Sequence, residues 1–105
     1  MVSKNLHTKA SVIIPAYNAA HSLPGCLAAV REQDVDAPYE IIVVDDCSAD
    51  QTAVLAEASD VTLISHDRRR GAAAARNSGI EAAQGEIICF TDADCAPRQD
   101  WISQI

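Results

Sequence analysis

The 105-residue sequence has little of several residue types, and each shortage argues against a class of protein. Aromatic residues make up only 4% of the chain, so a core would be built mainly from Ala, Ile, Val and Leu. No C-x-x-C pair occurs, and no histidine stands at zinc-ligand spacing from a cysteine. We therefore expect free, mostly buried thiols in a reducing compartment. The four cysteines are Cys26, Cys47, Cys89 and Cys95.

Positive charge and long apolar runs are also scarce. The formal net charge is -7, which argues against general affinity for nucleic acid or for anionic membranes. No apolar run reaches membrane-spanning length, and the first ten residues, MVSKNLHTKA, contain no apolar signal segment. We expect a soluble cytoplasmic domain with no membrane contact through this segment, although a longer protein that contains it could be membrane-associated.

The sequence does contain a regular alternation of short apolar runs and longer Ala-rich segments. The apolar runs predict four strands, at residues 10–14, 41–44, 61–64 and 87–90. Helices are predicted between them, near residues 23–33, 48–58 and 71–85. Strands linked by helices in this way predict an α/β fold, with an open, mostly parallel sheet and helices on both faces. We divide the chain into a tail at residues 1–9 and one domain at residues 10–105.

Individual residues indicate where these elements end. Pro15 should close the first strand. Ser48 and Gln51 have the spacing of a capping box at the start of the second helix. Gly85 should be the C-terminal glycine of the third helix. Gly79 inside that helix costs about 1 kcal/mol relative to alanine, which indicates close contact with a neighbouring backbone or ligand.

Polar residues interrupt the apolar pattern at the carboxyl ends of three predicted strands. These ends are Pro15-Ala16-Tyr17-Asn18, Asp45-Asp46-Cys47-Ser48 and Thr91-Asp92-Ala93-Asp94. Open parallel sheets bind ligands at this edge. If the fourth strand lies beside the first, the strand order reverses there and the three polar ends share one crevice.

Asp92 and Asp94 place two charges directly after a buried strand, where unpaired charge is costly. Residues two apart in an extended segment point the same way, so both carboxylates can face one point. Two carboxylates so close together raise each other's pKa unless a cation lies between them. Mg²⁺ or Mn²⁺ would suit these oxygen ligands and would usually bind diphosphate as well. The alternative is that the acids cap the following turn and point into solvent.

The other polar residues of the predicted crevice also allow two interpretations each. One of Asp45 and Asp46 can cap the second helix or bond loop amides, and the other can accept a hydrogen bond from a nucleobase or a sugar hydroxyl. The arginines at 68–70 are typical of a solvated basic loop, although the start of the third helix at Gly71 can favour an anion. Arg76 lies in an Ala-rich helix and needs a partner. Neither a P-loop nor a G-x-G-x-x-G pattern is present, which excludes those two phosphate-binding classes.

Three segments together resemble the nucleotide-binding half of a family 2 glycosyltransferase with the GT-A fold. They are SVIIPAYNAAHSLPGCL, EIIVVDDCSADQT and GAAAARNSGIEAAQGEIICFTDADCAPRQDW. Members of that family transfer a sugar from a nucleoside diphosphate donor, usually with inversion. The resemblance therefore implies the donor-binding domain of a metal-dependent transferase, with a UDP-sugar as the expected donor and Mn²⁺ or Mg²⁺ as the cofactor.

The resemblance also implies roles for individual residues. The donor-binding residues would be Pro15, Ala16, Tyr17, Asn18, Asp45, Asp46, Gly71, Arg76, Asp92 and Ala93. Asp46 would contact the base, with Asp45 beside it in support. Asp94 would be the direct metal ligand, with Asp92 as a second ligand nearer the ribose or the donor sugar.

The family's general base, an Asp or Glu, lies well beyond the D-x-D, whereas this sequence ends at Ile105. We therefore expect a fragment of a longer transferase that binds its donor but has little transferase activity alone. A truncated sheet would leave an open edge and favour self-association. Two other interpretations remain: a non-catalytic nucleotide-binding or interaction module of the same fold, and a haloacid-dehalogenase-like phosphatase, whose D-x-D lies near the N-terminus.

Overall fold

The computed structural model describes residues 8–105, so the predicted tail lies mostly outside the described residues. Along the chain the elements are β1 (Ala10–Ala16), α1 (Leu23–Arg31), β2 (Tyr39–Asp45), α2 (Thr52–Glu57), β3 (Thr62–Ser65), α3 (Ala72–Ala82) and β4 (Ile87–Phe90). The predicted alternation of strands and helices is confirmed, and β4 has the predicted bounds.

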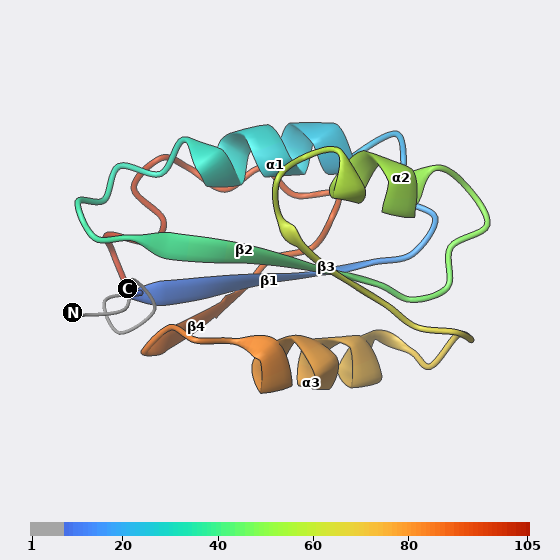
Figure 1. The fold of residues 1–105 in the computed structure, drawn as a ribbon. Helices are drawn as coiled ribbons and strands as arrows, with labels where there is room; N and C mark the ends of the chain where they lie inside the picture. Colours follow the sequence, from blue (N-terminus) through green and yellow to red (C-terminus); the bar gives the residue numbers. More distant parts are fainter. Residues whose placement is uncertain (1–7) are drawn as a thin grey trace.

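The four strands form one parallel sheet with the order β3-β2-β1-β4. β4 lies beside β1, in a register that pairs Phe90 with Ile13. The strand order therefore reverses at β1, as the shared-crevice prediction required. Figure 1 shows α1 and α2 on one face of the sheet and α3 on the other. The predicted α/β class, with helices on both faces, is confirmed.

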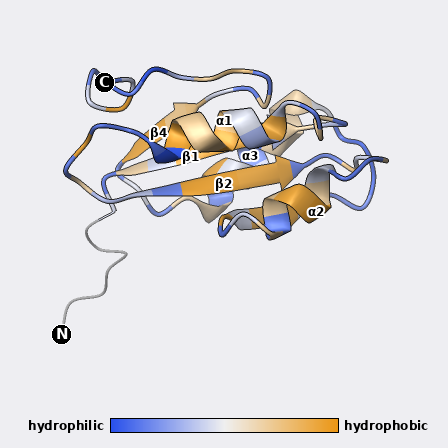
Figure 2. Ribbon diagram, turned by 90° about the horizontal axis from the view of Figure 1, so that it is seen from above, coloured by the Kyte–Doolittle hydropathy of each residue, from blue (hydrophilic) through white to orange (hydrophobic). Residues whose placement is uncertain are grey.

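Side chains of the central strands alternate between two apolar clusters, one on each face of the sheet. Val12 and Ile14 point toward α1, whereas Ile13 points toward α3 and packs near Ala75. The alternation arises because successive residues of a strand face opposite sides of the sheet. Figure 2 shows hydrophobic colour along much of β2, whose residues 42–44 are almost completely buried. These central strands therefore form a rigid base for the loops at their carboxyl ends.

β1 continues through Pro15 to Ala16, two residues beyond its predicted end. The Ile13 carbonyl accepts a hydrogen bond from the Thr91 N–H, on the β4 side, at 3.2 Å. The Ala16 carbonyl instead accepts from the Asp46 N–H, following β2, at 2.9 Å. Since backbone groups of a strand face alternate neighbours, the Pro15 nitrogen faces the β4 side, where β4 has already ended. Proline therefore removes no hydrogen bond from the sheet.

The capping box predicted for the second helix is wrong. α2 begins at Thr52, and the Ser48 hydroxyl accepts a hydrogen bond from the Asn18 N–H at 2.8 Å. The Asp50 carboxylate accepts the Thr52 N–H at 3.0 Å. Ser48 therefore connects the ends of β1 and β2 instead of starting a helix.

The prediction for Gly85 is also wrong, because α3 ends at Ala82. A Cβ atom at Gly85 would lie 2.6 Å from the backbone carbon of Ala10, so glycine allows the chain to pass close to β1. At Gly79 the predicted close contact is present, but it involves a side chain: an added Cβ would overlap Ile13. Glycine therefore sets the distance between α3 and the sheet.

All four cysteines are free, which agrees with the sequence prediction. Cys26 and Cys89 are buried, but Cys47 and Cys95 are exposed, so the expectation of mostly buried thiols holds for only two. None of the helices within residues 8–105 has the length and apolar character needed to cross a lipid bilayer.

Candidate functional site

Two adjoining recesses lie at the carboxyl ends of the strands, and we call them together the crevice. The larger has a volume of about 290 Å³ and is lined by Pro15, Tyr17, Asn18, Ala19, His21, Ser22, Ala93 and Asp94. The smaller has a volume of about 120 Å³ and is lined by Pro15, Ala16, Tyr17, Asp46, Arg69, Ala72, Ala75, Arg76 and Asp92. The ends of β1, β2 and β4 therefore meet, and most of the predicted binding residues lie in one place.

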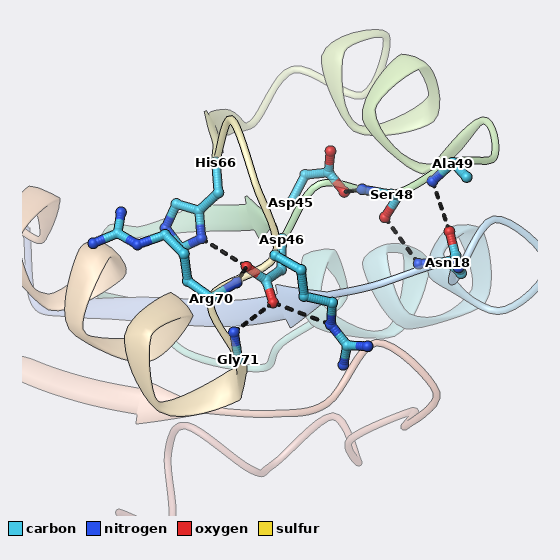
Figure 3. Close-up of polar contacts among 9 residues, drawn as sticks. Asn18, Asp45, Asp46, Ser48, Ala49, His66, Arg70 and Gly71 are labelled. Atoms are coloured by element: carbon cyan, nitrogen blue, oxygen red, sulfur yellow. Dashed lines mark hydrogen bonds and ion pairs between the residues drawn. The ribbon is translucent and has the colours of Figure 1, made fainter.

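Two of the predicted binding residues, Asp45 and Gly71, line neither recess. Asp45 is buried and accepts a hydrogen bond from the Ser48 N–H at 3.2 Å. Asn18, in a left-handed conformation, accepts a hydrogen bond from the Ala49 N–H at 2.8 Å (Figure 3). These bonds fix the loop after β2 against the loop after β1, so Asp45 shapes the crevice from outside it.

Asp46 is 3% exposed and lies at the centre of a hydrogen-bond network (Figure 3). Its Oδ1 atom lies 2.8 Å from Nδ1 of His66 and accepts the Arg70 N–H at 2.9 Å. Its Oδ2 atom accepts the Gly71 N–H at 2.8 Å. Burial alone would raise the pKa of Asp46, but the hydrogen bonds from His66 and the two amides lower it to about 2. Asp46 is therefore ionised at neutral pH and holds the loop before α3.

Arg69 was not predicted as a separate site residue within the arginine run. Its guanidinium carbon lies 3.5 Å from the centroid of the Tyr17 ring, and its Nε lies 3.5 Å from Oδ2 of Asp46. A planar cation therefore covers the tyrosine ring and pairs with the buried carboxylate. No sequence pattern separates Arg69 from its neighbours, because both contacts come from distant parts of the chain.

His66 was also missed as a site residue. The end of β3, Ser65-His66-Asp67, was not included among the predicted polar strand ends, yet it lies at the same edge of the sheet. His66 is 8% exposed and contacts both Asp46 and Ser78. A histidine directly after a predicted strand was the available signal.

Arg76 lies in an Ala-rich helix and was predicted to need a partner, and the structure provides an acidic one. Its Nη2 atom lies 3.8 Å from Oδ1 of Asp92, so α3 contributes a positive charge beside the D-x-D. Both side chains are substantially exposed, and the pair therefore contributes little to stability. Its main consequence is to place a cation where an anionic ligand would approach.

The D-x-D segment is not extended, contrary to the prediction. The Cys95 N–H bonds the Asp92 carbonyl at 3.0 Å and closes a turn, with Ala93 buried inside it. The turn still gathers the acids, because the ligand atoms of Asp92, Asp94 and Cys95 all lie within 4.8 Å of one another. Carboxylate oxygens are the ligands that a small divalent cation prefers. Asp92 and Asp94 could therefore hold such an ion together.

Cys26 lies beneath this turn, where its thiol donates a hydrogen bond to the Asp92 carbonyl at 3.4 Å. Burial, followed by the nearby Cys95, Asp94 and Asp92, raises the pKa of the Cys26 thiol to about 11. The thiol is therefore neutral at physiological pH and supports the turn without adding a negative charge.

A comparison with known proteins identifies the family of this chain. The sequence model described as "Glycosyl transferase family 2" matches residues 11–105. The chain belongs to this family. As a member of glycosyl transferase family 2, it is 40% identical to glycosyltransferase AglE of Haloferax volcanii over 100 residues, covering 90% of this chain and 33% of AglE. The family gives no support to the phosphatase interpretation.

Solved structures of other proteins share the fold. The crystal structure of S. aureus TarS 1-349 in complex with UDP-GlcNAc matches with a TM-score of 0.85 and 30% identity, over 92% of this chain and 30% of that one. Mannosyltransferase PcManGT from Pyrobaculum calidifontis, in complex with GDP-Man and Mn²⁺, matches with a TM-score of 0.79 and 34% identity, over 87% of this chain and 29% of that one. The chain spans about a third of the length of these proteins.

Proposed function

We propose that this chain forms the donor-binding part of a glycosyltransferase that takes a sugar from a nucleoside diphosphate sugar. The observation that carries the proposal is the meeting of three strand ends in one crevice, with Tyr17 and Asp46 on one side and Asp92 and Asp94 on the other. Together its two recesses reach the volume range of small-molecule sites, about 300–1,000 Å³. The complexes of TarS with UDP-GlcNAc and of PcManGT with GDP-Man support this class of ligand.

We assign the nucleoside to the smaller recess. Tyr17 offers an aromatic face on which a base can stack, and Oδ2 of Asp46 offers an acceptor for a base N–H. Only Oδ2 faces a group that can move away, namely the exposed side chain of Arg69. Uracil has a single ring N–H between its two carbonyl groups, so it can donate one hydrogen bond to the one available oxygen, Oδ2 of Asp46. Guanine presents two adjacent donors and would require both oxygens. This argument supports a UDP-sugar as the donor.

We assign the diphosphate and a divalent cation to the D-x-D turn. Asp94 and Asp92 supply the carboxylate oxygens that Mn²⁺ and Mg²⁺ prefer, and Arg76 adds a positive charge on the α3 side. A bound cation would neutralise the diphosphate leaving group as the sugar departs. The PcManGT complex with Mn²⁺ supports a divalent cofactor, and the donor set itself suits either ion.

The general base is not assigned to a residue of the crevice. Asp100 follows the D-x-D, but it lies in a separate recess with Asp34, Arg98 and Gln99 and pairs with Arg98 at 3.4 Å. It therefore cannot deprotonate an acceptor bound next to Asp94. We propose that sugar transfer requires a base and an acceptor site from outside the crevice.

Calorimetric titration with UDP, GDP and dTDP, each with and without Mn²⁺, tests the proposal. We expect binding that strengthens with Mn²⁺ and is tightest for UDP. Absence of binding to all three nucleotides under both conditions would rule out the donor site.

Asp94→Asn tests the metal assignment separately. The variant should lose about tenfold or more of the Mn²⁺-dependent affinity for UDP, because an amide is a poorer ligand for a hard cation than a carboxylate. Binding of UDP without metal should change little. A loss of equal size with and without Mn²⁺ would show that Asp94 does not hold the cation.

A further inference from the structure

His66 is a buried residue with two polar contacts that donor binding does not yet explain. Its ring lies between the end of β2 and α3, with Nδ1 2.8 Å from Oδ1 of Asp46 and Nε2 2.8 Å from Oγ of Ser78. Figure 3 shows the ring directed at the Asp46 carboxylate. His66 therefore bridges the carboxylate to the helix that carries Arg76.

The chemistry of Asp46 determines the direction of its hydrogen bond with His66. Asp46 is ionised at neutral pH, and a carboxylate only accepts hydrogen bonds. Nδ1 of His66 must therefore carry the proton that it shares with Asp46. The other ring nitrogen, Nε2, makes the hydrogen bond with Oγ of Ser78. Asp46, His66 and Ser78 therefore form one hydrogen-bond chain.

The same order of side chains occurs in the nucleophilic triads of hydrolases, but the surroundings exclude that role. Ser78 lies near the middle of α3, between Ala72 and Ala82, where backbone N–H groups bond to carbonyls of the preceding turn. A nucleophilic serine needs two or more free N–H donors beside it to stabilise an oxyanion. The hydrogen-bond chain from Ser78 through His66 therefore orients Asp46 and does not support acyl transfer at Ser78.

We propose that His66 is a positioning residue for nucleobase recognition. By holding Oδ1 of Asp46, it fixes the plane of the carboxylate so that a lone pair of Oδ2 points into the crevice, where Arg69 now lies. Ser78 fixes the ring in turn through Nε2. The inference deepens the proposed function and rests on it, because it explains how the buried carboxylate keeps one acceptor available for a base.

Substitutions of different length at residue 66 test this role. The amide nitrogen of asparagine is as far along the side chain as Nδ1, so His66→Asn retains a donor toward Asp46. The amide nitrogen of glutamine matches Nε2, so His66→Gln retains only the contact toward Ser78. We would titrate the wild-type chain and both variants with UDP and with pyrophosphate, each in the presence of Mn²⁺.

His66→Gln should weaken UDP binding about tenfold, the loss expected when a charged acceptor loses a hydrogen bond that orients it. His66→Asn should bind UDP within about twofold of the wild-type chain. Both variants should bind pyrophosphate as the wild-type chain does, because the D-x-D turn is untouched. Equal UDP affinities in the two variants, or a parallel loss of pyrophosphate binding, would overturn the inference.

Ser78→Ala provides a second test that does not depend on the folding of the residue 66 variants. It keeps the contact between His66 and Asp46 but frees the far side of the ring, so UDP affinity should fall about two- to threefold with pyrophosphate affinity unchanged. An unchanged affinity for UDP would overturn the inference. A wild-type chain that bound pyrophosphate but not UDP would instead refute the proposed function, and the inference with it.

Discussion

At the scale of single residues, the Asp46 carboxylate has about four positions that can accept a hydrogen bond, and the chain already occupies them. A histidine and two backbone amides take three of these positions at 2.8–2.9 Å. The fourth is taken by Nε of Arg69 at 3.5 Å, from a side chain that is 58% exposed. The same guanidinium covers the Tyr17 ring. Arg69 therefore occupies both places that a stacked nucleobase would use, and it is the group that a base would displace.

Arg69→Ala should consequently bind UDP more tightly than the wild-type chain. A cation–π contact and an exposed ion pair contribute about 0.5–1 kcal/mol each, or about 1–2 kcal/mol together, so their removal should raise affinity about five- to thirtyfold. Calorimetry with UDP and Mn²⁺ measures the change. Arg68→Ala, at an exposed neighbour in the same loop, controls for the lost positive charge. A weaker affinity in Arg69→Ala alone would show that this guanidinium contacts the bound nucleotide.

Asp46 should also make the stability of the fold depend on pH. Its pKa is about 2 in the folded chain and 3.8 as a free side chain, so its contribution is complete above about pH 4 and is lost as the pH falls toward 2. The contribution is about 2 kcal/mol. Urea unfolding from about pH 5 to about pH 2.5, a range over which much of this contribution is lost, should therefore show a shallower loss of stability in Asp46→Asn than in the wild-type chain. Parallel curves for the two proteins would contradict this assignment.

At the scale of elements, the distance between α3 and the sheet depends on one glycine. A Cβ atom at Gly79 would overlap the fully buried side chain of Ile13, whereas a Cβ at Gly25 in α1 would meet nothing within 4 Å. Gly79→Ala should lower the free energy of unfolding by about 1–3 kcal/mol. Gly25→Ala should raise it by about 0.5–1 kcal/mol, because alanine favours the helix. Urea unfolding at neutral pH compares the matched pair, and equal stabilities would show that Ile13 moves aside without cost.

The elements themselves could be predicted because their signals are local. β4 has the predicted bounds, since a short run of apolar residues stands out against its polar neighbours in the sequence. The capping box failed because the Ser48 hydroxyl binds Asn18, which is 30 residues away. The same distinction applies to the site. Three strand ends could be predicted from polar residues after apolar runs, but the contacts of Arg69 and His66 depend on how separate loops meet.

At the scale of the whole molecule, the two edges of the sheet differ. Among residues 8–105, β4 pairs only with β1, and beside it lies a recess of about 360 Å³ lined by Phe90, Thr91, Cys95, Ala96, Pro97 and Trp101. Phe90 is 42% exposed. The opposite edge, β3, has the same length as β4 but begins and ends with the exposed polar residues Thr62 and Ser65. An unpaired strand edge with apolar side chains is prone to pair with another chain, so β4 is the edge at which we expect self-association.

Phe90→Lys should therefore weaken self-association of the chain. A charged residue on an edge strand opposes pairing with a second copy, because the charge would have to lose its hydration in the contact. Sedimentation velocity over a wide range of protein concentrations should show dimers or larger species for the wild-type chain and mainly monomers for the variant. Val54→Lys introduces the same charge at an exposed apolar residue of α2, far along the chain from β4, and should associate as the wild-type chain does. If the wild-type chain stays monomeric at every concentration, or if both lysine variants reduce association equally, the β4 edge is not the contact surface.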